Sequence, residues 1–206
     1  ANAAALGEMA YGVAKGMKNF IMITLGTGVG AGIVINGQMV YGSDGLAGEL
    51  GHVTMVRQNG RLCGCGRRGC LEAYCSATGV ARTAREFLAE TEEPSLLREM
   101  NPDDITSLDV SKAAAKGDAL ACRVYEFTGK MLGEACADFT TFCSPEAYVF
   151  FGGLTKAGDL LMKPLLQSYD ENVMAVFRGK AKFLISSLDG AGAAVLGASA
   201  IAKKCE

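Results

Sequence analysis

The stretch Phe20-Ile-Met-Ile-Thr-Leu-Gly-Thr-Gly-Val-Gly-Ala-Gly-Ile-Val-Ile35 holds two apolar runs separated by glycines. Short runs of apolar, β-branched residues are typical of buried strands, which predicts strands at 20–25 and 31–35. The glycine-rich segment 26–30 between them predicts a tight turn. We therefore expect the two strands to form a β-hairpin.

Helical and strand patterns alternate through the rest of the chain. Helices are predicted at 3–16, at 75–90, from a cap at Asp109 and Ser111 to Gly117, from Asp118 to Ser144-Pro145, from Pro164 onward and at 190–204. Further strands are predicted at 53–56, 148–151 and 183–185, with loops at 42–51 and 91–108. The order of elements predicts an α/β fold with a mixed sheet flanked by helices.

Two of the predicted helices have an apolar face that we expect to be buried. The long helix carries the stripe Leu120, Val124, Phe127, Met131, Ala135, Phe139 and Phe142, typical of core or of a subunit contact. The helix opened by Pro164 is expected to point Leu165, Tyr169, Val173 and Val176 inward.

The composition is that of a globular protein with no sign of a polyanionic partner. The 206 residues make one large domain or two small ones, and 20 basic against 22 acidic side chains leave a net charge of −2. This balance indicates neither a nucleic-acid nor an anionic-membrane partner for this part of the protein. No apolar stretch reaches the roughly 18 residues of a membrane helix, and no signal pattern opens the chain, so we expect a cytoplasmic protein.

The strongest local signal is a cluster of metal-ligand residues. The single histidine, His52, is followed by Cys63, Cys65 and Cys70 within nineteen residues. Three thiolates and one imidazole are a set of ligands that structural zinc takes, and the glycines between them let the chain fold around one ion. The alternative is a chance cluster of cysteines in a loop. The wide scatter of Cys122, Cys136, Cys143 and Cys205 favours a reducing compartment over a disulfide framework.

Two glycine segments and two carboxylates are weaker candidates for ligand contacts. The turn at 26–30 can hold phosphate on backbone N–H groups, although a plain hairpin turn explains it equally well. Gly152-Gly153 follows a predicted strand, where backbone can approach a ligand closely. Glu49 and Glu72 flank the cysteine segment and can accept hydrogen bonds from a polyol, although surface glutamates are common.

Together these motifs resemble the ROK family of sugar kinases and sugar-responsive repressors along the whole chain. Gly48-Glu-Leu-Gly-His52 with Cys63-Gly-Cys-Gly-Arg-Arg-Gly-Cys-Leu-Glu72 resembles the family's zinc and sugar segment. The segment 25–30 resembles its second phosphate loop, and 109–118 and Gly152-Gly153 also fit its pattern.

The resemblance implies an actin-like, ribonuclease-H-type fold of two lobes, with ATP and sugar in the cleft between them. Residues 1–206 would be the larger, C-terminal lobe, carrying a zinc loop. It implies that the sugar contacts are Glu49, His52 and Glu72, and that the zinc ligands are His52, Cys63, Cys65 and Cys70. It implies that Gly26, Thr27, Gly28 and Gly30 face the ATP phosphates and Gly152 and Gly153 the nucleoside.

The resemblance also implies that this chain holds no catalytic base. In the family that base is an Asp in an Asn-Asp-Ala-Asn segment, of which only Ala1-Asn2 is present, so the Asp is expected just before Ala1. The N-terminal lobe, on which a helix at 190–204 would pack, is missing, and the chain alone is expected to be inactive. The parent protein is expected to form a dimer.

Three functions follow as expectations. The first is an ATP-dependent, glucokinase-like enzyme that transfers the γ-phosphate of Mg-ATP to a hydroxyl of a hexose or N-acetylhexosamine. The second is the sugar-binding lobe of a ROK-type transcriptional repressor. The third is a zinc-stabilised structural module, which leaves Glu49 and Glu72 without a role.

Overall fold

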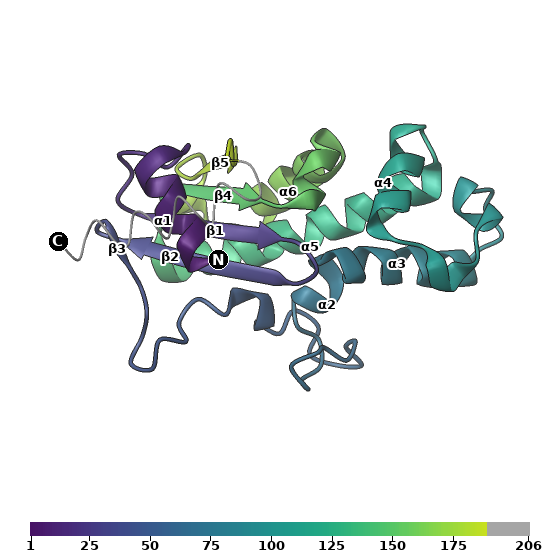
Figure 1. Cartoon of the computed structure of the whole chain (residues 1–206), viewed down its shortest axis with the longest axis horizontal. Coiled ribbons are helices and arrows are strands. Elements are labelled where there is room, and N and C mark those ends of the chain that lie inside the picture. Colours follow the sequence, from purple (N-terminus) through teal and green to yellow (C-terminus); the bar gives the residue numbers. More distant parts are fainter. Residues whose placement is uncertain (189–206) are drawn as a thin grey trace.

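The computed structural model describes residues 1–188, and a five-stranded mixed sheet runs through its centre (Figure 1). The strands are β1 (Phe20–Leu25), β2 (Val29–Ile35), β3 (Gln38–Met39), β4 (Ala147–Phe151) and β5 (Lys182–Ile185). Their order across the sheet is β3-β2-β1-β4-β5. β1 pairs antiparallel with β2 and parallel with β4, and β4 pairs parallel with β5. The predicted hairpin is confirmed, with β2 starting at Val29 rather than at Ala31.

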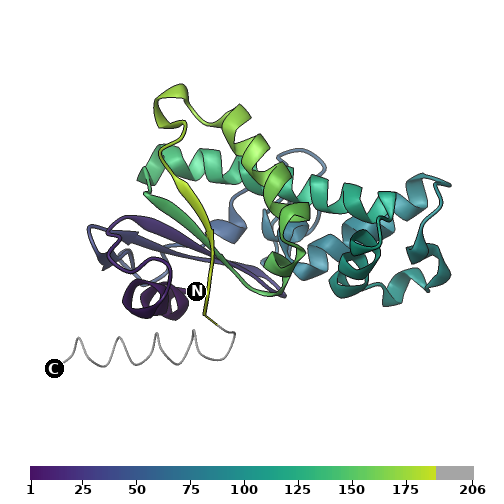
Figure 2. The same cartoon turned by 90° about the horizontal axis from the view of Figure 1, so that it is seen from above.

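The helices cover both faces of this sheet. They are α1 (Asn2–Tyr11), α2 (Glu72–Cys75), α3 (Ala77–Glu90), α4 (Ser107–Ala115), α5 (Ala119–Cys143) and α6 (Asp159–Asn172). Figure 2 shows α1 on one side of the sheet and α5 with α6 on the other. The predicted helix at 190–204 lies outside the described residues.

Burial on both faces explains why the central strand β1 is apolar at every position except the half-buried Thr24. Ile21, Ile23 and Leu25 belong to the large core that includes α3, α4, α5 and α6. Phe20 and Met22 point the other way, into a smaller core beneath α1. Successive side chains of a strand alternate between its faces, so a strand covered on both sides needs no polar positions.

Two predicted elements at the start of the chain are wrong in extent or kind. The first helix ends at Tyr11 instead of residue 16, because Gly12 is extended and the side chain of Glu8 accepts the N–H of Val13 at 2.8 Å. Residues 53–56 form no strand: Thr54 makes only an isolated bridge to Cys70. The backbone of this segment is occupied by the cysteine loop, so it cannot join the sheet.

Further corrections concern the later helices. Pro164 lies inside α6 instead of opening it, and its ring packs where Gly129 of α5 has no side chain. Val176 follows α6 and is 57% exposed, not inward. Phe142, in the apolar stripe of α5, is 87% exposed and therefore does not belong to this core.

The helix predicted to start at Asp109 starts one residue after Thr106. Thr106 is the N-cap, and Asp109 completes a capping box with it. The predicted loop 91–108 contains two short 3-10 turns, Leu96–Glu99 and Pro102–Asp104. It is not wholly solvated, because it buries Leu97 and Ile105 against the core.

The N-cap of α5 supports a prediction about acid stability. The carboxylate of Asp118 accepts the backbone N–H groups of Ala121 at 2.9 Å and Leu96 at 2.6 Å. Burial by itself raises the pKa of Asp118, but these hydrogen bonds outweigh it and hold the pKa below the ordinary 3.8. The stabilisation is therefore present above the unfolded-state pKa and is lost as the pH falls through the lower folded-state pKa.

Replacing this cap, Asp118→Ala, is expected to lower the free energy of unfolding at pH 7 by about 1–2 kcal/mol. The difference from the wild type is expected to shrink as the pH falls below 3.8. Urea unfolding at pH 7 and near pH 3 measures the difference in the free energy of unfolding between the variant and the wild type at each pH. Asp138→Ala, at an exposed position of α5, is the matched control and should change little. A pH-independent difference would contradict the assignment.

The crossing of α5 and α6 supports a prediction about packing. A Cβ on Gly133 of α5 would lie 2.4 Å from the carbonyl oxygen of Leu165 in α6. Gly133→Ala is expected to destabilise the chain by about 1–3 kcal/mol through overpacking. This outweighs the gain of about 1 kcal/mol in helix propensity. Thermal unfolding of Gly133→Ala measures the change, with Asp138→Ala as the control. A Gly133→Ala chain with the same stability as the wild type would refute the close crossing of α5 and α6.

Candidate functional site

Two parallel strands end side by side at one edge of the sheet and place the two glycine segments together. Thr24 near the end of β1 is paired with Phe151 at the end of β4. Gly152 has a φ of +116°, and a Cβ there would lie 2.3 Å from the carbonyl oxygen of Leu25. Only glycine allows this approach, and the carboxyl ends of parallel strands are where open α/β sheets bind ligands.

A cavity of about 360 Å³ opens at this edge. Its lining residues are Thr24, Leu25, Gly26, Gly28, Val29, Gly30, Glu49, His52, Glu72, Phe151 and Gly152. The cavity thus brings together the three residues predicted to contact sugar and four of the six predicted to contact ATP. It has the size and the few convergent polar groups of a small-molecule site.

Glu72 connects the glycine turn to the cysteine loop. Its Oε2 accepts the backbone N–H of Val29 at 3.0 Å, and its Oε1 lies 3.5 Å from the Sγ of Cys63. A Cβ on Gly28 would lie 2.4 Å from Oε2, so the absence of a side chain there lets the carboxylate reach the turn. The carboxylate therefore has a fixed place at the wall of the cavity.

The two ring nitrogens of His52 lie near different groups. It ends the short 3-10 turn Leu50–His52, and its Nδ1 lies 3.7 Å from the Sγ of Cys63. Its Nε2 lies 3.9 Å from a carboxylate oxygen of Glu49. One edge of the ring is thus directed at the thiols, while the other remains available to a ligand in the cavity.

The predicted metal ligands converge. The ligand atoms of His52, Cys63, Cys65 and Cys70 all lie within 4.8 Å of one another. The Sγ atoms of Cys65 and Cys70 are 3.7 Å apart. Zinc–sulfur bonds of about 2.3 Å in a tetrahedron place two sulfurs about 3.8 Å apart. The donor set and its spacing therefore fit a zinc ion.

The thiols differ in how readily they lose a proton. Burial raises the pKa of Cys63, and it raises that of Cys70 to about 12. A backbone hydrogen bond from Arg67 lowers the pKa of the exposed Cys65. Arg67 also donates to the carbonyl of His52 at 3.3 Å, so it ties the tip of the loop to the histidine turn. A divalent cation takes the place of thiol protons when it binds.

Thr27 and Gly153, the other two residues predicted to contact ATP, line a neighbouring cavity of about 270 Å³. The two cavities share Leu25 and Gly26. Lys156, in the 3-10 turn Gly153–Ala157, lines the second cavity and was not among the predicted site residues. The sequence feature that could have identified Lys156 as a site residue is its position three residues after Gly153.

No helix of residues 1–188 is both long and apolar enough to cross a membrane.

A family profile described as the ROK family matches residues 1–205. The chain belongs to the ROK family. The glucokinase of Halalkalibacterium halodurans is 42% identical over 207 residues, which cover 100% of this chain and 62% of that protein. The crystal structure of a ROK family glucokinase from Streptomyces griseus, in complex with glucose and AMPPNP, has 34% identity and a TM-score of 0.88. That match covers 99% of this chain and 66% of the other.

The resemblance extends more weakly to a regulator. The transcriptional regulator NagC of Escherichia coli is 30% identical over 200 residues, covering 97% of this chain and 48% of that protein. The expected fold class is confirmed: this ROK chain has the mixed α/β, actin-like ATPase fold. The chain spans less than two thirds of the length of the glucokinases and about half that of the regulator.

Proposed function

We propose that this ROK chain is the larger lobe of a glucokinase-like enzyme, which transfers the γ-phosphate of ATP to a hydroxyl of a hexose or N-acetylhexosamine. The observation that carries the proposal is that Glu49, His52 and Glu72 share one cavity with the glycine turn. Carboxylates and an imidazole nitrogen are suited to sugar hydroxyls, and backbone N–H groups are suited to phosphate. The greater similarity to glucokinases than to NagC supports the kinase over the repressor.

In this proposal the chain contributes positioning more than chemistry. Glu49 and Glu72 accept hydrogen bonds from the sugar, and the Nε2 of His52 adds a third contact. The turn at Gly26, Thr27, Gly28 and Gly30 holds the phosphates of Mg-ATP, and Gly152-Gly153 faces the nucleoside. Phosphoryl transfer depends chiefly on such positioning and on charge stabilisation.

The catalytic base is proposed to be an Asp just before Ala1, in a segment that leads from the N-terminal lobe. Ala1 lies beside the cavity, since a Cβ on Gly30 would be 3.3 Å from the Cβ of Ala1. Gly32 of the same strand lies against the carbonyl of Ala1 in the same way. A residue directly before Ala1 would therefore be next to the proposed sugar site.

Zinc is proposed as a structural ion held by His52, Cys63, Cys65 and Cys70. The Nδ1 of His52 is the nitrogen nearer the thiols, which leaves Nε2 for the sugar. In this role the ion supplies no reaction chemistry and fixes the shape of the loop that carries the sugar contacts.

We also propose a cytoplasmic, dimeric protein. The scatter of the cysteines outside the proposed zinc set suits a reducing compartment better than a disulfide framework, which supports the cytoplasmic proposal. Phe142 at 87% and Val176 at 57% exposure leave apolar surface on the α5–α6 side for a second subunit. Light scattering of the parent protein tests the dimer.

The experiment that tests the kinase is ADP release by the protein that joins this chain to the proposed N-terminal lobe. A panel of hexoses and N-acetylhexosamines serves as acceptors, and the 206-residue chain alone is the background control. One sugar that drives ADP release supports the kinase and names its substrate. Sugar binding with no ADP release would favour the repressor. A protein that shows no sugar binding and no ADP release would favour the structural module.

A further inference from the structure

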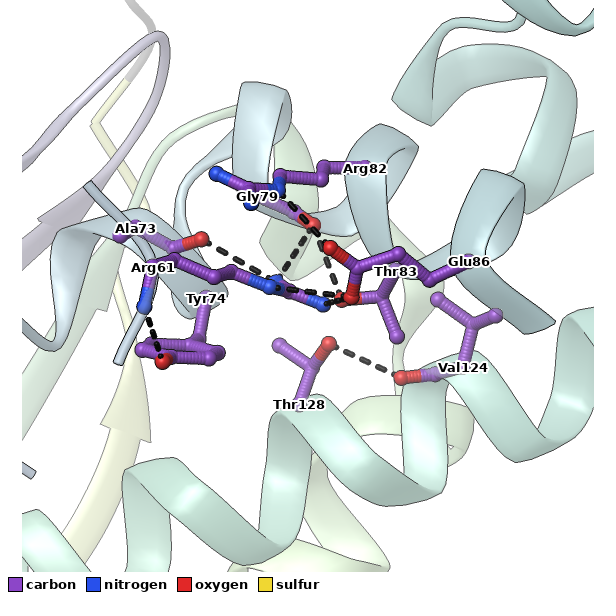
Figure 3. A network of polar contacts seen from close by, with 9 residues as sticks. All are labelled: Arg61, Ala73, Tyr74, Gly79, Arg82, Thr83, Glu86, Val124 and Thr128. Carbon is purple, nitrogen blue, oxygen red and sulfur yellow. Dashed lines mark hydrogen bonds and ion pairs between the residues drawn. The ribbon is translucent and has the colours of Figure 1, made fainter. Parts of the chain in front are cut away.

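Arg61 is a buried cation just outside the proposed sugar site. It lies two residues before Cys63, and its side chain is only 8% exposed. Its Nε donates to Oε2 of Glu86 on α3 at 3.1 Å, and its Nη2 pairs with the same oxygen. Its guanidinium also stacks over the ring of Tyr74, 4.5 Å from the centroid. Figure 3 shows the side chain enclosed between α2 and α3.

The same residue holds the helix that carries Glu72. The Nη1 of Arg61 donates to the carbonyl of Ala73 at 3.1 Å, and its backbone N–H donates to the hydroxyl of Tyr74 at 2.8 Å. Ala73 and Tyr74 directly follow Glu72 in α2. Arg61 thus fixes α2 to the segment that leads into the first cysteine.

The carboxylate of Glu86, which pairs with Arg61, is stabilised in its charged form. Burial alone raises the pKa of Glu86, but the guanidinium groups of Arg61 and Arg82 outweigh burial and hold it below its usual value. Arg82 lies 2.9 Å from the other oxygen of Glu86. Arg61 is buried but Glu86 is 39% exposed, and such ion pairs contribute little net stability, so the importance of this pair lies in the geometry that it fixes.

We infer that Arg61 is a positioning residue that sets the place of Glu72 in the cavity and thereby the affinity for sugar. The inference rests on the proposed function. Its physical path is short: Arg61 fixes Ala73 and Tyr74, and Glu72 before them reaches the N–H of Val29 at 3.0 Å. Without the guanidinium, α2 loses the hydrogen bond that fixes the carbonyl of Ala73. The carboxylate of Glu72 then no longer has a fixed distance from the glycine turn at 26–30. The zinc ligands are not removed.

The test compares Arg61→Met and Arg61→Lys in the parent kinase. For Arg61→Met we expect the KM for sugar, and the sugar Kd by calorimetry, to rise about tenfold. We expect the KM for ATP to stay close to that of the wild type and the zinc content to stay at one ion per chain. Arg61→Lys keeps the charge but loses the planar fork, so it should recover part of the sugar affinity.

The matched control is Arg82→Met, which loses an ion pair to the same Glu86 but has no bond to α2. It should leave the sugar Kd unchanged. If Arg61→Met does not fold, Arg61→Lys and Glu86→Gln provide the decisive measurements. The inference is overturned if a folded Arg61 variant has the sugar Kd of the wild type. It is also overturned if Arg82→Met raises the sugar Kd as much as Arg61→Met does. Either result leaves the proposed function standing. A wild-type protein that binds no sugar overturns the proposed function together with the inference.

Discussion

The double variant Cys63→Ser, Cys70→Ser is expected to contain no zinc, and the unchanged chain is expected to contain one ion. Both cysteines are buried, and they supply half of the converging ligand set. Serine hydroxyls do not replace thiolates as zinc ligands. Structural zinc contributes on the order of 10 kcal/mol in small domains, so the loop should lose its fixed structure. Metal analysis and limited proteolysis between residues 57 and 70 measure the two effects.

Cys143→Ser is the matched control for this variant. Cys143 is a half-buried thiol at the end of α5, far in the chain from the ligand set. Its replacement should leave one zinc per chain and an unchanged proteolysis pattern. A chelator added to the wild type should reproduce the double variant. Zinc that persists at one per chain in the double variant would show that these sulfurs are not its ligands.

The features predicted correctly from sequence are those that nearby residues decide. The hairpin follows from two apolar runs and the glycines between them, and the structure pairs Leu25 with Val29 across the turn. Asp118 caps α5 as predicted, because the N–H group that donates to its carboxylate belongs to Ala121, only three residues further along the chain. The cysteines converge because short glycine linkers leave them few other arrangements.

The features that were predicted wrongly or not foreseen are those that distant residues decide. Pro164 indicates a helix start by its own chemistry, yet it lies within α6 because Gly129 of α5 makes room for its ring. That Thr27 and Gly153 line a second cavity was not foreseen, because it depends on how β1 and β4 end together. Their contact with ATP stays a prediction. Arg61 was not singled out at all, because its meaning depends on Tyr74 and Glu86.

Glu72→Gln is expected to weaken sugar binding by about 10–100-fold, the value of one hydrogen bond to a charged group. The amide keeps the shape of the side chain but replaces one acceptor oxygen with a donor. The backbone N–H of Val29 and a sugar hydroxyl then compete for the single oxygen that remains. Calorimetric titration of the parent protein with its sugar measures the change. Glu126→Gln, at an exposed position on α5, is the matched control.

Zinc content separates this variant from the cysteine variant. Glu72 is not a member of the ligand set, so Glu72→Gln should lose sugar affinity and keep its zinc. The cysteine variant should lose both, because Cys63 lies 3.5 Å from Glu72 and the loop forms part of the wall around it. Gly28→Ala should resemble Glu72→Gln, since its new Cβ would meet the carboxylate at 2.4 Å. Full sugar affinity in a zinc-free cysteine variant would show instead that the ion does not shape the sugar site.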